Sequence, residues 1–294
     1  MNALKKRDSM AWLKEKTDAI ASNSEQKAAE TPRALFLPGS DEFMRAMPNH
    51  IARSSLFAPV ARGRKKMHKD TVLQSRGDAV IKFWGEQLDE AQADVWMQAL
   101  KEAQRLPLGT PVVINRAEFL QAIGRQAGNY QYKWLHRAME ALAFAMLVIQ
   151  VTKENGKPKL SIGKTSALHM IDSFDYDEDA QAYLLRIDPR WVMMFGNREY
   201  ALIDWNKRMQ ISQGQDMAKT LQRLVATSNN LVQHYALDWL QSKMEYGGRL
   251  RDFRDALNRA CDELERLEIV VSHKIEDSTR GKPQLTIWLP LTVE

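Results

Sequence analysis

Basic side chains crowd the start of a helix-like stretch near the carboxyl end of the sequence. Free N–H groups and the dipole at a helix start attract anions, guanidinium groups pair with phosphate, and asparagine can hydrogen-bond base edges. Residues 248–269 carry an apolar stripe, and near the start of this stretch Arg249, Arg251, Arg254 and Asn258 lie off the stripe. Their grouping predicts contacts to the phosphates and bases of DNA.

A second set of similar side chains occurs in the middle of the sequence. Residues 129–144 carry an apolar face on one side and polar residues on the other. Each of the two helix-like stretches is followed by a hairpin pattern with basic residues near its turn. The candidate DNA-contacting residues of this kind are Tyr130, Gln131, Lys133 and Arg137 on the helix, and Lys157, Lys159, Arg280 and Lys282 on the hairpins.

A single basic helix face is usually only a solvated surface. Two basic helices, each followed by a hairpin, are instead typical of two winged-helix domains, in which Lys and Arg bind phosphate and polar side chains contact bases. The aromatic residues Trp134, Trp239 and Phe253 fall on or near apolar faces, so we expect them in the core rather than stacked on bases.

The elements that position the set on residues 129–144 can be followed from residue 79 onward. Hydrophobic periodicity and the stop at Pro107 indicate their bounds, and Asn115 is a predicted helix N-cap. The expected order is a strand at 80–84, a helix at 89–106, a strand at 112–114, helices at 115–123 and 129–144, a hairpin at 147–163 that we take as the wing, and two further strands around an acidic loop near Asp175.

The second half repeats this order. A break at Asp188-Pro189 precedes it, and Gly247-Gly248 interrupts it before the last helix. The expected elements are a strand at 201–205, helices at 215–228 and 232–244, the basic helix at 248–269, and a hairpin formed by residues 269–289.

These patterns predict an α+β fold of two tandem winged-helix domains, each a helix-turn-helix with a β-hairpin, behind an N-terminal tail. The tail, residues 1–70, is rich in charge and shows little sustained apolar periodicity, so we expect it to be mostly disordered. The first domain is predicted at residues 71–188 and the second at residues 189–294.

Bulk composition fits a DNA-binding protein without proving one. The 294 residues carry 42 Lys and Arg against 37 Asp and Glu, a formal net charge of +5, which favours anionic partners. The single cysteine, Cys261, excludes an internal disulfide and suits a reducing cytoplasm. We find no pattern for secretion or for a membrane span, and therefore expect a cytoplasmic protein.

Two motifs that resemble enzyme or metal sites fail on inspection. Gly163-Lys164-Thr165 resembles a phosphate-binding loop, but Pro158 stands where its first glycine belongs. The acidic stretch from Asp175 resembles a calcium loop, but Ala180 and Arg186 replace the required glycine and glutamate. The six histidines form no metal-binding pair of known spacing. We therefore expect no catalytic residue, no metal and no cofactor, that is, a protein that is not an enzyme.

Long strings of the sequence resemble one known family. From about Leu35 onward, the chain is similar to the TrfA replication initiators of broad-host-range plasmids. The similar strings are ALFLPG, MPNHIARSSLFAPVARGRKK, KFWGEQLDEAQADVWMQAL, IDSFDY, LLRIDPRW, NREYALIDW and QDMAKTLQRLVATS.

The resemblance implies a plasmid replication initiator. Members of this family bind repeated sites called iterons in double-stranded origin DNA through two winged-helix domains, help to open the duplex, and recruit the host replicative helicase together with the host initiator. They also limit plasmid copy number, exist in a monomer–dimer equilibrium, and are not ATPases. We expect the same activities and partners here.

The resemblance further implies a segment that binds the host sliding clamp and ends in Leu-Phe. The matching pentapeptide is residues 53–57, in which the third to fifth positions agree with the family pattern and the first two do not. We predict Leu56 and Phe57 as an exposed clamp-binding pair, since an exposed apolar pair in a polar tail otherwise has little structural purpose. The alternative is that the pair packs on the first domain.

Two other functions remain open from the residues alone. A transcriptional regulator built from the same winged-helix domains would need no contact with clamp or helicase, and a replication assay separates it from an initiator. An origin nickase or a nucleotide-driven enzyme is disfavoured by the failed motifs, and incubation with supercoiled origin DNA, magnesium and ATP would reveal cleavage or turnover.

Overall fold

Ordered elements begin inside the stretch for which the sequence predicts a tail. The structure, a computed structural model, describes residues 35–60, 65–153, 157–164, 166–178 and 182–291. Strand β1 (Met44–Pro48) pairs antiparallel with β12 (Tyr200–Asp204), a partner far along the chain. The predicted disorder is therefore wrong for residues 44–60 and 65–70, whereas residues 1–34 and 61–64 of the predicted tail lie outside the described residues. The other early elements are α2 (Asn49–Ala52), β2 (Phe57–Ala58) and β3 (Met67–Val72).

The helices of the first half form where local signals place them. Helix α3 (Glu90–Ala103) begins with a capping box, in which Asp89 and Gln92 each bond the other's backbone N–H at 2.9 Å. Asn115 caps α4 (Arg116–Ala122) as predicted, its Oδ1 accepting from the N–H groups of Ala117 at 2.9 Å and Glu118 at 3.2 Å. The remaining elements of this part are β4 (Ala79–Glu86), β5 (Leu88–Asp89), β6 (Val112–Asn115) and α5 (Asn129–Phe144).

The hairpin that follows α5 lies in a sheet that does not contain β6. Strands β7 (Met146–Thr152) and β8 (Pro158–Ile162) extend a sheet of order β3-β4-β7-β8, in which β9 (Leu168–His169) also pairs with β7. The strands that pair with β6 are instead β10 (Ser173–Asp177) and β11 (Ala182–Arg186), in the order β10-β11-β6. The hairpin predicted at residues 147–163 does form, but its strands do not join the sheet of β6, because a turn signal identifies a hairpin and not the sheet that the hairpin joins.

The second half contains one strand where a helix is predicted. Residues 232–236 form β13 (Val232–Ala236), which pairs with β15 (Pro283–Trp288), and only α8 (Leu237–Lys243) is helical. Long-range pairing decides this segment, since short apolar runs suit either structure. The other elements are η1 (Pro189–Arg198), α6 (Trp205–Gln210), α7 (Asp216–Val225), α9 (Leu250–Arg266) and β14 (Ser272–Asp277).

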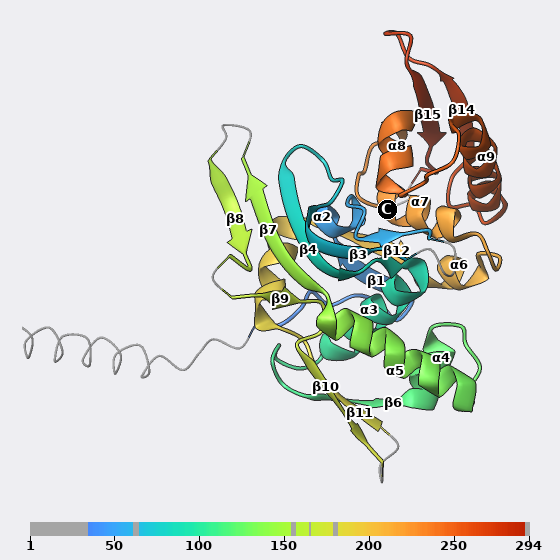
Figure 1. The fold of residues 1–294 in the computed structure, drawn as a ribbon. Helices are drawn as coiled ribbons and strands as arrows, with labels where there is room; N and C mark the ends of the chain where they lie inside the picture. Colours follow the sequence, from blue (N-terminus) through green and yellow to red (C-terminus); the bar gives the residue numbers. More distant parts are fainter. Residues whose placement is uncertain (1–34, 61–64, 154–156, 165, 179–181, 292–294) are drawn as a thin grey trace, which may run out of the picture. The chain divides into compact units, whose positions relative to one another are not determined.

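One order of elements occurs twice in this mixed fold of helices and strands. In the first repeat it is α3, β6, α4, α5 and the hairpin β10–β11, and in the second repeat it is α7, β13, α8, α9 and the hairpin β14–β15. The strand orders also agree, β6-β11-β10 and β13-β15-β14. The first repeat differs by the insertion of β7–β9 before its hairpin. Figure 1 shows each hairpin beside the longest helix of its repeat.

Two hydrophobic clusters form the core. The first runs from Leu37 to Trp205 and the second from Ile211 to Ile287. Trp191 belongs to the first, where its ring lies edge-on to that of Trp96 at 4.9 Å. The first cluster thus extends to Trp205, which is later in the chain than the predicted domain boundary after residue 188. Within the described residues, no helix has both the length and the apolar character needed to cross a bilayer.

Candidate nucleic-acid interface

Helix α9 exposes the basic residues at its amino end. Arg249 occupies the N-cap position, and Arg251 and Arg254 are exposed one turn apart, whereas Asn258 is half-buried on the next turn of the same face. No ion pair of Arg251 or Arg254 occurs within the described part of the chain. Since a helix start carries partial positive charge, two guanidinium groups there form a site for an anion such as phosphate.

The opposite face of α9 is buried. Phe253 is 0% exposed, as predicted for a core residue, and Leu257, Cys261 and Leu264 follow it inward. Burial of this stripe against the second cluster fixes the rotation of the helix. The arginines are therefore held outward by packing on the far side.

The hairpin β14–β15 presents two further cations at its turn. Arg280 and Lys282 are exposed there. The turn is closed by bonds from the Ser278 N–H to the Lys282 carbonyl and from the Gly281 N–H to the Ser278 carbonyl, each 2.8 Å. Gly281 has φ +68°, a conformation that glycine adopts without steric cost.

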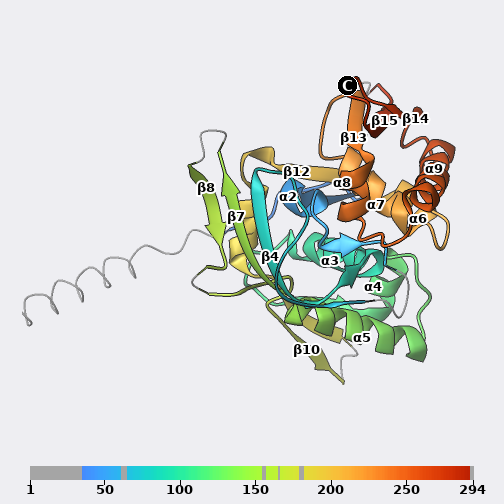
Figure 2. The same ribbon diagram turned by 45° about the horizontal axis from the view of Figure 1, so that its top comes forward.

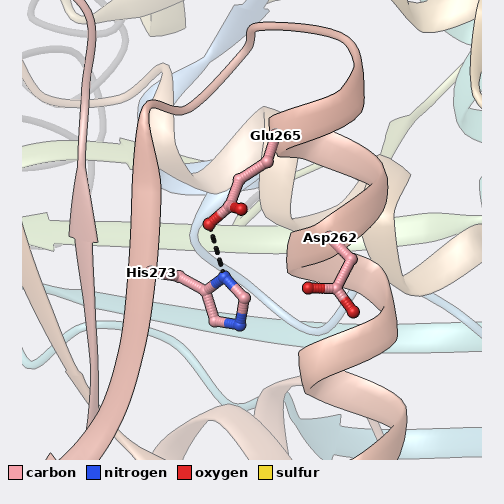
Figure 3. A group of neighbouring side chains, drawn as sticks. All are labelled: Asp262, Glu265 and His273. Atoms are coloured by element: carbon pink, nitrogen blue, oxygen red, sulfur yellow. Dashed lines mark hydrogen bonds and ion pairs between the residues drawn. The ribbon is translucent and has the colours of Figure 1, made fainter.

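A side-chain contact ties this hairpin to α9. His273 on β14 bonds Glu265 on α9 through Nδ1 at 2.7 Å, and Figure 3 shows Asp262 one turn before Glu265. The three side chains offer ligand atoms within 4.8 Å of one another, enough to hold a divalent cation. Glu265 already uses the Nδ1 of His273, so the bond explains the grouping as an anchor of hairpin to helix.

Helix α5 of the first repeat spreads its polar side chains over a longer surface. Tyr130 is 72% exposed, and Lys133 and Arg137 are exposed on the following turns. Gln131 is half-buried, with its Oε1 accepting from Arg125 Nη1 at 3.0 Å. Tyr130, Lys133 and Arg137 thus lie on one outward surface, whereas Gln131 is bonded to Arg125 within the protein.

A groove beside α5 contains residues that sequence reasoning missed. It has a volume of about 320 Å³ and separates α5 from the hairpin β10–β11, which lies along that helix (Figure 2). Arg116 lies 4.0 Å from the ring centre of Tyr132 and 5.2 Å from that of Tyr176. The residues that line the groove are Arg116, Tyr132, Lys133, His136, Arg137, Glu140, Tyr176 and Tyr183.

The groove combines cations with aromatic rings. Burial raises the pKa of Tyr183 to about 12, so its hydroxyl stays protonated, and that hydroxyl lies 3.3 Å from Nδ1 of His136. Arg116 directly follows the predicted N-cap Asn115, which is a local signal that could have identified it. Tyr176 could not be found in that way, because its place depends on the long-range pairing of β10–β11 with β6.

Lys157 and Lys159 lie away from this arrangement in the topology. Both are exposed, but they belong to the β7–β8 hairpin, whose sheet does not contain β6, β10 or β11. Lys159 forms an ion pair with Glu199. They are the weakest of the predicted DNA contacts.

Comparison with known proteins identifies the family. The model of the family described as TrfA protein matches residues 9–280. The chain belongs to the TrfA family. A curated relative, the plasmid replication initiator protein TrfA of Escherichia coli, is 24% identical over 257 residues. The match covers 85% of this chain but 64% of that TrfA protein, so the chain spans less than two thirds of the relative's length.

The fold is also similar to solved structures. Crystal structures of domains 2 and 3 of RctB superpose with TM-scores of 0.52 and 0.50 at 13% and 11% sequence identity. Each superposition covers 83% of this chain, and 99% and 98% of the respective RctB chain. At such identity the likeness shows that this TrfA-family chain shares its fold with RctB.

The Leu-Phe pair expected from the TrfA resemblance is buried. Leu56 and Phe57 are both 0% exposed, and the Phe57 ring lies 5.9 Å from that of Trp96. Phe57 pairs in parallel with Leu88, and its carbonyl accepts from Arg223 Nη2 at 3.1 Å. The predicted exposure is wrong, and the alternative of packing on the first domain holds. The sequence around this pair carries no local signal of its distant partners, which include Leu88 and Arg223.

The positions of Trp134 and Trp239 agree with the prediction that they pack against the core. Both are partly buried against the core clusters. Arg125 covers the Trp134 ring at 3.5 Å, and the Tyr235 ring stacks on Trp239 with centres 6.2 Å apart. One neighbouring side chain therefore packs on each indole ring.

Proposed function

We propose that this TrfA-family chain is a plasmid replication initiator that binds iteron repeats in double-stranded origin DNA. The observation that carries the proposal is the repeated order of helix, strand, two helices and hairpin, with one strand order in both copies. That order is the one found in winged-helix domains, where the last helix enters the major groove. By this assignment α5 and α9 are the recognition helices, and β10–β11 and β14–β15 are the wings.

The second repeat supplies most of the phosphate affinity. The cations exposed at the start of α9 and at the turn of its hairpin are Arg249, Arg251, Arg254, Arg280 and Lys282. Guanidinium groups bind phosphate or guanine in a bidentate manner, and the amide of Asn258 has the donor and acceptor needed for adenine. Arg254 and Asn258 follow one another on the outward face, so they are the candidates for base contacts here.

The first repeat contributes the polar surface of α5 and the groove beside it. Tyr130, Lys133 and Arg137 lie outward, and Arg116 extends the surface toward the hairpin. Phosphate contacts from this surface would set the register of the protein on the duplex. Lys157 and Lys159 are proposed only as peripheral phosphate contacts.

The wider activities of an initiator belong to the same proposal. They are origin opening, recruitment of the host replicative helicase and initiator, control of copy number, and a monomer–dimer equilibrium, all in the cytoplasm. None of them needs a catalytic group, a metal or a cofactor, and we propose that the protein is not an enzyme. Contact with the sliding clamp through Leu56 and Phe57 would require this pair to leave the core.

A winged-helix transcriptional regulator is the second candidate. The burial of Leu56 and Phe57 favours it, because a regulator needs no clamp-binding segment. A plasmid carrying the cognate origin, supplied with this protein in a host cell, separates the two. Replication supports the initiator, whereas promoter repression without replication supports the regulator.

Equilibrium binding to iteron DNA over a range of salt concentrations tests the proposal directly. If Arg249, Arg251, Arg280 and Lys282 of the second repeat and Lys133 and Arg137 of the first each bind one phosphate, log affinity falls with log salt at a slope of about −5.4. A scrambled duplex of equal length serves as the control. A flat salt dependence, or equal affinity for the scrambled duplex, would contradict specific iteron binding.

A further inference from the structure

A charge cluster with a fully buried centre joins the two repeats. At its centre is Glu90, the first residue of α3 in the first repeat, which is paired with Arg208 on α6 and Arg223 on α7. All three side chains are 0% exposed. Arg208 Nη2 lies 2.9 Å from Glu90 Oε2, and Thr220 on α7 donates to Glu90 Oε1 at 2.6 Å.

A second carboxylate extends the cluster by one helical turn. Asp94 accepts from Arg208 Nε at 2.5 Å and from Lys219 Nζ at 2.6 Å. Helix α3 thus contributes two carboxylates on one face, and α6 and α7 contribute three cations. The cluster is a bridge between helices rather than a pairing within one helix.

The donors of the arginines are largely satisfied. Arg208 Nη1 donates to the Lys219 carbonyl at 3.0 Å and to Gln222 Oε1 at 3.3 Å, and Arg223 Nη2 donates to the Phe57 carbonyl at 3.1 Å. Burial alone would raise the pKa of Glu90, but Arg223 and Arg208 hold it at about 2, so the carboxylate stays ionised at any working pH.

Buried ion pairs contribute little net stability compared with apolar packing, but their hydrogen bonds are directional. Guanidinium forks accept a carboxylate in few orientations. A cluster with two such forks therefore restricts both the distance and the rotation between the helices that carry it. Those helices, α3 and α7, hold the same position in the two repeats.

We infer that Glu90 and Asp94, by holding Arg208, Arg223 and Lys219, fix the spacing between the two recognition helices and so select the spacing of the two half-sites that one chain can bind. The inference rests on the proposed function, since it assumes that both repeats contact DNA. Glu90 and Asp94 are positioning residues, because they contact no DNA themselves.

Removal of the Glu90 charge is the sharpest test. Glu90→Gln keeps the side-chain shape but leaves two buried guanidinium groups facing a neutral amide, which loosens the joint between the repeats. The matched control is Asp188→Asn, because Asp188 is 5% exposed and its ion-pair partner, Arg190, lies two residues further along the chain, so this pair does not join the repeats. Both variants of the full chain would be compared by circular dichroism and thermal unfolding before binding is measured.

The readout is affinity for duplexes in which the two half-sites are moved apart one base pair at a time, up to half a helical turn. We expect the wild type and Asp188→Asn to lose about tenfold or more in affinity away from the native spacing, since simultaneous binding then fails. Glu90→Gln should show less than about threefold variation over the same probes, and Glu90→Asp, which keeps the charge, should restore part of the discrimination.

Each outcome decides a separate claim. If the wild type binds no iteron at any spacing, the proposed function fails. If the wild type binds but folded Glu90→Gln keeps the full spacing dependence, the inference is wrong. Should Glu90→Gln not fold, Lys219→Met replaces it, because Lys219 lies at the partly exposed rim of the cluster and contacts Asp94 alone among the described carboxylates; an unchanged spacing profile in that variant overturns the inference equally.

Discussion

The two repeats share one scaffold but differ in where their charges lie. In the second repeat, the cations collect at the start of α9 and at the turn of its hairpin. In the first repeat, they are spread along α5, and the hairpin β10–β11 carries the acidic residues Asp175, Asp177 and Glu178. A basic wing can follow a phosphate backbone, whereas an acidic wing is repelled by it. If the proposed function holds, this difference implies that the second repeat makes the main contact with DNA and that the first contributes less to affinity.

The largest effect should follow from changes at the start of α9. Arg251→Ala combined with Arg254→Ala removes two exposed guanidinium groups, and we expect a loss of about 100-fold in iteron affinity and loss of specificity. Fluorescence anisotropy with iteron and scrambled duplexes measures both. A variant with the same charge change elsewhere, Lys82→Ala with Arg105→Ala, is the control. Unchanged affinity would show that α9 is not the main recognition helix.

A smaller effect is expected on α5. Lys133→Ala combined with Arg137→Ala should lower affinity by about tenfold and make the salt slope less steep by about two, as expected for two phosphate contacts. The same anisotropy titrations over a range of salt measure the slope. A loss larger than that of the α9 variant would show that the first repeat, and not the second, makes the main contact with DNA.

A still smaller effect is expected on the inserted hairpin. Lys157→Ala combined with Lys159→Ala should change affinity by less than about threefold, because these residues lie in the sheet that contains neither wing. An electrophoretic mobility-shift assay at low salt is sensitive enough to detect a larger loss of affinity. A tenfold loss would restore β7–β8 as a DNA-contacting hairpin.

We expect the smallest effect on DNA affinity from a change in α8. At this helix the two repeats differ instead in what sets the stability of the fold. The seven-residue helices α4 and α8 end at Ala122 and Lys243, and Lys243 is 0% exposed, with Nζ donating to the Ser54 carbonyl at 2.8 Å. Burial, together with the like charge of Arg223, lowers the pKa of Lys243 from 10.5 to about 7.

This shift gives stability a defined pH dependence. Between pH 7 and 10.5 the unfolded chain holds a proton on Lys243 that the folded chain has lost, so rising pH stabilises the folded state. Relative to Lys243→Met, the wild type should gain up to about 1.4 kcal/mol per pH unit in this window and show no further change below it. Urea unfolding of both proteins across this range measures the difference. A constant difference at all pH values would show that Lys243 stays charged in the fold.

Features set by neighbouring residues could be predicted from the sequence. The cap at Asn115, the apolar stripe of α9 and the outward arginines opposite it depend only on helical spacing. Features set by distant partners could not. Phe57 is buried where β2 pairs with β5, and the hairpin β10–β11 joins the sheet of β6 because β11 pairs with β6.

Glu90 illustrates the same limit at the level of one side chain. An acidic residue in the first turn of a helix usually stabilises the helix dipole at the surface. Its burial here depends on Arg223 from the other repeat and on Arg208 from α6, which comes before that repeat in the chain. Periodicity contains no information on that pairing, so the cluster that joins the repeats was visible only in the structure.

A hydroxyl-radical footprint of the full chain on the cognate iteron tests the central claim most directly. If α5 and α9 both enter the major groove, the chain should protect two stretches on one face of the duplex, with centres about one helical turn, or about 10 base pairs, apart. In the Arg251→Ala and Arg254→Ala double variant, the stretch that belongs to α9 should disappear first. A single protected stretch no longer than one half-site in the wild type would contradict binding by both repeats.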